Sequence, residues 1–149
     1  MIAPAQIFAM ANGLATLGWV ALAVSLFTPK WQIGIRRITG YVIPALFAVL
    51  YIFYIWKGSM EATGGGFGSI AEVRALFAND SALLAGWLHY LAFDLFVGTW
   101  IVRRGTLDGV NRFLLLLCLP ITFMFGPIGF LVFLTERAVF SRRSAGEIP

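Results

Sequence analysis

Residues 83–102 are the feature that most constrains the fold, a stretch of twenty residues that reads LLAGWLHYLAFDLFVGTWIV and is almost entirely apolar. A helix of this length is about what is needed to cross a hydrocarbon core of ~30 Å. The stretch nevertheless contains His89 and Asp94. An ionisable side chain at bilayer depth costs at least ~2.5 kcal/mol, so such residues usually face a protein interior and mark function. We therefore expect the function of the protein to depend on this helix.

The rest of the chain is also too apolar for an ordinary soluble domain. Hydrophobic residues make up 60% of the 149 residues, charged residues 12%, and the mean hydropathy is +0.86. This composition predicts an all-α, multi-pass integral membrane protein. At about thirty residues per span and turn, we expect one domain over residues 1–149, with four transmembrane helices in one bundle. The predicted spans are residues 5–27, 38–56, 83–102 and 113–135.

The charged and sulfur-containing residues exclude several classes of function. The net charge of +4 comes from basic residues in loops and near the C-terminus, without the basic and aromatic stripe of a nucleic-acid interface. Cys118 is the only cysteine and His89 the only histidine. One chain therefore cannot build a disulfide framework, a cysteine metal cluster or bis-histidyl haem ligation. We expect no metal and no cofactor, and a haem shared across a dimer remains an alternative.

Residues 57–82 form the one long polar segment between predicted spans. Ser69 followed by Glu72 predicts a capping box, and apolar residues at helical spacing follow it. We expect a short amphipathic helix over residues 69–80, between spans two and three. It either lies on the membrane surface or acts as a lid over the mouth of the bundle, with Glu72 and Arg74 as the lid residues.

The polar residues of the third span can be placed around the helix. Trp87, Tyr90 and Asp94 share one stripe, at i, i+3 and i+7, and His89 lies about 140° from Asp94. The two ionisable residues can then border one cavity without touching each other. A neutral Asp can donate a proton and a neutral His can accept one, which suits acid-base chemistry on an apolar substrate.

A structural reading of the same residues stays open. Asp94 can bond to Asn12, to Tyr41 or to a carbonyl freed near Pro127, and His89 can bond across helices, because polar side chains often join membrane helices. The fourth span has no charge, but its Gly126-Pro127-Ile128-Gly129 run predicts a bend or local unwinding.

The chain resembles a known family over most of its length from Ile70 onward. The resemblance is carried by Trp87-Leu88-His89-Tyr90-Leu91-Ala92-Phe93-Asp94-Leu95-Phe96, by Leu119-Pro120-Ile121-Thr122-Phe123 and by Gly126-Pro127-Ile128-Gly129. These segments resemble the abscisic-acid-deficient 4 (ABA4-like) family of small four-helix membrane proteins from plastids and bacteria. Its plant members are required to make neoxanthin from violaxanthin, a rearrangement in which an epoxide opens and an allene forms.

The resemblance implies a membrane protein, in a bacterial inner membrane, that binds a carotenoid or related isoprenoid. If it is an enzyme, we expect a carotenoid isomerase with Asp94 as the acid and His89 as the base. The residues expected to contact the ligand are Asn12, Trp87, Tyr90, Trp100 and Thr122. The expected partners are membrane lipid and an apolar polyene or isoprenoid, and a homo-oligomer or larger membrane complex is compatible with the sequence. The alternative is a non-catalytic membrane subunit or pigment-binding scaffold, in which the polar residues are packing contacts.

Overall fold

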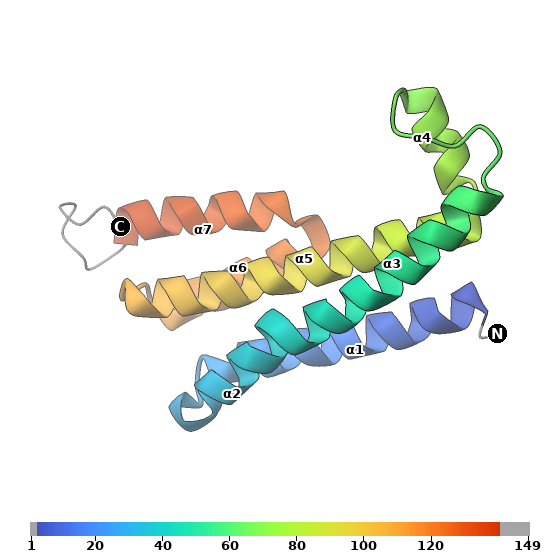
Figure 1. Ribbon diagram of the computed structural model, residues 1–149. Coiled ribbons are helices and arrows are strands. Elements are labelled where there is room, and N and C mark those ends of the chain that lie inside the picture. Colours follow the sequence, from blue (N-terminus) through green and yellow to red (C-terminus); the bar gives the residue numbers. More distant parts are fainter. Residues whose placement is uncertain (1–2, 141–149) are drawn as a thin grey trace. The chain divides into compact units, whose positions relative to one another are not determined.

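The computed structural model describes residues 3–140, and within them the chain is helical and has no strand (Figure 1). This confirms the all-α prediction for the part of the chain that is described. In order, the elements are α1 (Pro4–Ser25), η1 (Pro29–Trp31), α2 (Gln32–Arg37), η2 (Ile38–Val42), α3 (Ile43–Glu61), α4 (Ile70–Phe77), α5 (Asp80–Leu107), α6 (Arg112–Phe125) and α7 (Pro127–Phe140).

Within residues 3–140, three helical stretches are by length and composition able to cross a membrane, namely Pro4–Ser25, Pro29–Glu61 and Asp80–Leu107. They contain most of the first three predicted spans, and the second and third are longer than predicted. Their helices continue into polar flanks because Pro29 is accommodated at the first helical position and Asp80 suits the first turn of α5. Of the three, α5 is the most buried, at 50% of its apolar window against 28% for each of the others.

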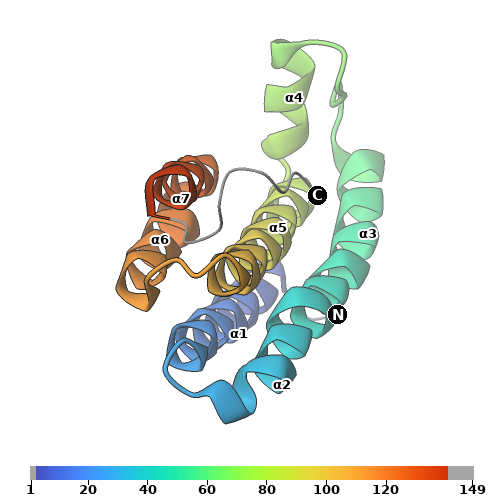
Figure 2. The same ribbon diagram turned by 90° about the vertical axis from the view of Figure 1, so that its left-hand side faces the viewer.

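The fourth predicted span requires correction. Residues 113–135 do not form one bent helix but are divided between α6 and α7, each of 14 residues. The chain reverses between them at Gly126, whose φ is +35°, and Pro127 follows without a backbone N–H to continue the ladder. The two helices lie side by side in both views (Figures 1 and 2). At 1.5 Å per residue each is about 21 Å long, short of the ~30 Å core, so the count of four spans is not reproduced.

The α6–α7 hairpin is held together by close packing and one buried polar contact. A Cβ added at Gly129 would overlap the backbone of Thr122 on the facing helix, so glycine permits the approach of the two backbones. Further along, the thiol of Cys118 donates to the carboxylate of Glu136 at 3.0 Å, and both side chains are buried. The two helices of the hairpin are therefore closely packed against each other.

The described residues divide into two compact units. The first, called unit 1, comprises residues 3–15 and 43–93. In it Gly58 of α3 packs against Ala82 of α5, and Phe77 of α4 packs on Gly86 of α5. The predicted short helix is present as α4, and Ser69 caps it by accepting the Glu72 N–H at 3.2 Å. The reciprocal bond differs from the prediction, because the Glu72 carboxylate accepts the N–H of Gly68 at 3.0 Å.

The second, called unit 2, comprises residues 16–42 and 94–140. Here the other half of α5 packs against η2, where the hydroxyl of Thr99 donates to that of Thr39 at 2.8 Å. The ring of Trp19 lies against Gly98, at a distance that a side chain there would not allow. After α5, Asp108 accepts hydrogen bonds from Arg104 of α5 and Arg137 of α7, which ties the end of the hairpin to the end of α5.

Candidate functional site

His89 lies in unit 1, on α5, in contact with two aromatic rings. Its ring centroid is 5.8 Å from that of Tyr51 on α3 and 4.6 Å from that of Phe93. The side chain is exposed, and within residues 3–140 it has ring contacts but no hydrogen bond. The interhelical hydrogen bond considered for His89 is therefore not formed in the described part of the chain. An imidazole in this position would face the membrane interior unless a ligand or another protein surface covers it.

Trp87 and Asn12, both expected to contact a ligand, meet each other in unit 1. The indole N–H of Trp87 donates to the Asn12 side-chain oxygen at 3.1 Å. The Trp87 ring also lies 5.4 Å from that of Phe8 and 5.2 Å from that of Tyr90. Trp87 borders an apolar cavity of about 350 Å³, and Asn12 orients its ring without lining that cavity. The lining residues are Pro4, Ala5, Phe8, Asp80, Leu83, Leu84 and Trp87.

Asp94 lies in unit 2, half-buried against the turn of the α6–α7 hairpin. A Cβ added at Gly126 would be 2.7 Å from Asp94 Oδ1, so the carboxylate occupies the space that glycine leaves open. This position is at the N-terminus of α7, where unsatisfied backbone N–H groups and the helix dipole favour a negative charge. Asp94 therefore lies beside the Gly126–Pro127 turn, and this position favours the ionised carboxylate, whereas an acid role requires the neutral form. Both that role and a bond from Asp94 to a carbonyl freed near Pro127 stay predictions.

Thr122 and Trp100, the other two expected ligand residues of unit 2, have different environments. Thr122 has no exposed surface, donates to the Cys118 carbonyl at 2.8 Å and lies against Gly129. Its place in the hairpin interior gives a ligand no access to it, because helix packing fills the space around it. Trp100 is exposed at 36% and its ring lies 5.7 Å from that of Phe130 and 5.5 Å from that of Phe133.

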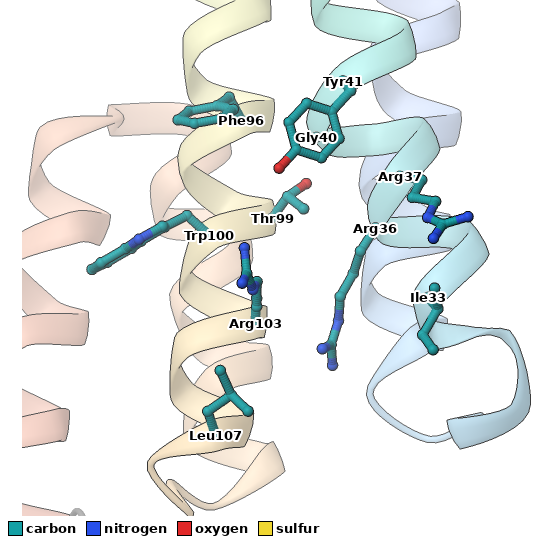
Figure 3. A pocket seen from close by; sticks show the side chains of 10 residues that line it. All are labelled: Ile33, Arg36, Arg37, Gly40, Tyr41, Phe96, Thr99, Trp100, Arg103 and Leu107. Atoms are coloured by element: carbon teal, nitrogen blue, oxygen red, sulfur yellow. The ribbon is translucent and has the colours of Figure 1, made fainter. Parts of the chain in front are cut away.

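Trp100 also borders a second cavity, of about 360 Å³, between the α2–η2 segment and α5 within unit 2 (Figure 3). Three arginines line it, and the sequence had assigned them to no site. The lining residues are Ile33, Arg36, Arg37, Gly40, Tyr41, Phe96, Thr99, Trp100, Arg103 and Leu107. The sequence does show that some lining residues share a helix face, since Thr99 and Arg103 are at i and i+4, as are Arg37 and Tyr41. The sequence alone does not reveal that these two helix faces lie opposite each other.

His89 and Asp94 fall in different units, since the boundary between the units crosses α5 after residue 93. They are five positions apart on α5, a spacing that corresponds to directions about 140° apart around the helix axis. Of the expected lid residues, both exposed, Glu72 accepts the N–H of Gly68 at the start of α4. The lid role of Glu72 and Arg74 stays a prediction. Within residues 3–140 no three His, Cys, Asp or Glu side chains gather as a metal site would require.

Comparison with known proteins identifies the family. A family model described as ABA DEFICIENT 4-like matches residues 6–133. Neither the curated proteins nor the solved structures gave a significant match. The matched region contains α1 from its third residue onward, all elements through α6, the turn at Gly126 and the first half of α7, so it includes both His89 and Asp94.

Proposed function

The chain belongs to the ABA DEFICIENT 4-like family, and we propose that it is a bacterial inner-membrane protein that binds a carotenoid or related isoprenoid and isomerises it. Its three long apolar helices suit a membrane protein and an apolar ligand. A four-helix bundle is the architecture implied by the resemblance, and the α6–α7 hairpin takes the place of the fourth helix in this chain.

The environment of His89 is the observation that carries this proposal. An exposed imidazole at membrane depth is unfavourable against lipid tails alone, yet the described residues offer it no hydrogen bond. The flanking rings of Tyr51 and Phe93 supply flat apolar surfaces, on which a conjugated chain can stack. A polyene with an oxygen-bearing end group could stack on these rings and form a hydrogen bond with the imidazole.

The proposed chemistry is an acid-base rearrangement without oxidation or reduction. Protonation of an epoxide oxygen by Asp94 breaks a carbon–oxygen bond and gives a hydroxyl group. Removal of a proton from the neighbouring carbon by His89 places that bonding pair in a new double bond, so the product is an isomer of the substrate. Because the two side chains are five positions apart on α5, they would act on separate atoms and not as a hydrogen-bonded pair.

A non-catalytic subunit or pigment-binding scaffold is the second candidate function. It is favoured by the bond between Trp87 and Asn12 and by the position of Asp94 against Gly126, since both are contacts that packing alone can explain. In this function the ligand is bound unchanged.

The carotenoid profile of a producing host separates the two functions. We expect expression of the protein to convert part of the host carotenoid to an isomer, and His89→Ala and Asp94→Asn each to remove that product. Ile52→Ala, at an exposed position on α3, is the control and should leave it unchanged. Membrane levels and thermal unfolding of each variant show whether it folds. A profile that is the same with and without the wild-type protein would reject the isomerase and leave the scaffold.

A further inference from the structure

The second cavity of unit 2 combines positive charge with an aromatic wall. Arg36 extends from α2 and Arg103 from α5 into the space between these helices, and Tyr41 extends toward α5 (Figure 3). The two walls of the cavity, from the α2–η2 segment and from α5, are in direct contact at Thr39, Gly40 and Thr99. A Cβ on Gly40 would be 3.0 Å from the Thr99 methyl group, and Thr39 accepts the Thr99 hydroxyl hydrogen bond. The cavity is therefore a built feature of the fold.

The local backbone on one side is unusual. Residues Ile38–Val42 form a π-helix between α2 and α3, so the residues after Arg37 are shifted in register relative to an unbroken α-helix. Such π-helical turns occur frequently at functional sites. Here the turn lets Arg36, Arg37, Gly40 and Tyr41 border the same cavity.

The positive charge in this cavity is not neutralised by the described residues. No acidic side chain lines it, and the three arginines Arg36, Arg37 and Arg103 form no ion pair within residues 3–140. Acidic Asp108 is nearby in sequence, but it accepts from Arg104 and Arg137.

One N–H group of the Arg36 guanidinium has no hydrogen-bond acceptor among the described residues. Its Nη2 donates to the Gln32 side-chain oxygen at 2.9 Å and to the Thr106 hydroxyl at 3.3 Å, which holds the guanidinium in place. Its Nε is buried and has no hydrogen-bond partner. A buried donor without an acceptor is costly, and an anion that accepts from it would remove that cost.

Apart from Thr99, the α5 side of the cavity wall beyond Arg103 is apolar, and it extends toward the middle of the helix. Leu107 is the last residue of α5, and Phe96 lies eleven residues earlier, about 16 Å along the axis. The arginines are thus near the helix end, where lipid headgroups lie, and the aromatic side chains of Phe96 and Trp100 are deeper. This polarity matches an amphiphile whose anionic head is at the membrane surface.

We propose that this cavity binds the phosphate group of an amphiphile, with Arg36 and Arg103 as its main ligands and Tyr41, Phe96 and Trp100 against the apolar part. Guanidinium groups suit phosphate because their planar donors can bind two oxygens at once. The phosphate can belong to a phospholipid headgroup or to an isoprenyl phosphate. The proposal does not rest on the proposed function, since neither His89 nor Asp94 lines the cavity.

The test is binding by the full-length protein in detergent, measured by native mass spectrometry. The probes are dioleoylphosphatidylglycerol, farnesyl monophosphate, dioleoylglycerol and inorganic phosphate. We expect a phosphate-bearing amphiphile to bind more tightly than dioleoylglycerol or phosphate alone. Arg36→Gln and Arg103→Gln should each weaken its binding about tenfold or more, the usual cost of a lost hydrogen bond to a charged group. Binding of only one amphiphile would identify the source of the phosphate.

Two further variants separate the effect of charge from that of the guanidinium group. Lys30→Gln removes one positive charge from an exposed residue of unit 2 outside the cavity and should change binding less than twofold. Arg103→Lys keeps the charge but loses the planar donor pair, and should weaken binding as well. If Arg36→Gln unfolds, the two Arg103 variants carry the test, because Arg103 forms no ion pair with other described residues. Equal losses in the Lys30 and arginine variants, or equal binding of inorganic phosphate and the amphiphiles, would overturn the proposal.

Discussion

Residues 83–102 carry a histidine and an aspartate and still lie in one continuous helix, α5, whereas residues 113–135 carry no charge and are divided between α6 and α7. Hydropathy measures the cost of immersing side chains in lipid, and by that measure the second stretch is the better span. Helix continuity depends on the backbone instead. Pro120 lies inside α6 without ending it, so the break at residue 126 requires a glycine with positive φ followed by a proline.

The division of residues 113–135 between α6 and α7 decides how many times the chain crosses the membrane. If α6 and α7 enter the membrane and return as a hairpin, the chain crosses three times and the N- and C-termini lie on opposite sides. Four spans would place both termini on the same side. Reporter fusions at the two ends, each active on only one side of the inner membrane, distinguish the cases. We expect opposite signals, and matching signals would mean that α6 and α7 together complete a fourth crossing.

Gly129→Ala should have the largest effect on stability. The added methyl group would overlap the backbone of Thr122, so α6 and α7 must separate, and we expect a loss of about 2–3 kcal/mol in the free energy of unfolding. Gly13→Ala in α1 is the matched control, because nothing lies within 4 Å of its added Cβ. Thermal unfolding in detergent measures both. An equal response of the two variants would show that the hairpin is not closely packed.

Asp108 should make the hairpin sensitive to acid. Burial raises the pKa of its carboxyl, but hydrogen bonds and positive charges from Arg137 and Arg104 outweigh this and hold the pKa below its usual 3.8. A carboxyl with a lowered folded-state pKa stabilises the fold above the unfolded-state value, and this contribution is lost as the pH falls below about 3.8. Asp108→Asn should lower the melting temperature by several degrees at pH 7.

The difference between wild type and Asp108→Asn should then shrink as the pH falls below about 4. Glu61→Gln is the control, since the Glu61–Lys57 pair is at the surface, with an N–O separation of 3.8 Å, and should contribute little. Melting curves from pH 7 to pH 3 provide the measurement. A constant difference across this range would mean that Asp108 acts through shape and not through charge.

Asn12→Ala should have the smallest effect. It removes the acceptor of the Trp87 indole N–H, and hydrogen bonds between membrane helices contribute about 0.6 kcal/mol on average. A double-mutant cycle with Trp87→Phe isolates this term, because the ring stays and only the donor is lost. A coupling energy above about 2 kcal/mol would show that this polar contact governs α5 as strongly as Gly129 governs the hairpin.

The sequence predicted those elements whose cause is local. Ser69 caps α4 because its side chain and the Glu72 N–H are three residues apart, and the first three spans follow from long apolar runs. The sequence predicted only a bend or local unwinding near Gly126, because a Gly-Pro pair indicates a break in a helix but not the angle between the two parts. The full reversal of the chain was therefore not predicted. The arginine cavity was missed because Arg36 and Arg103 are 67 positions apart in the chain and meet only through helix packing.

The central claim, that α5 carries the ligand site at His89, is tested most directly by the absorption spectrum of protein purified from a carotenoid-producing host. We expect wild-type protein to retain a polyene spectrum, and His89→Ala to lose most of it while the exposed Ile52→Ala control retains it. Colourless wild-type protein, or a spectrum unchanged by the His89 substitution, would contradict the claim.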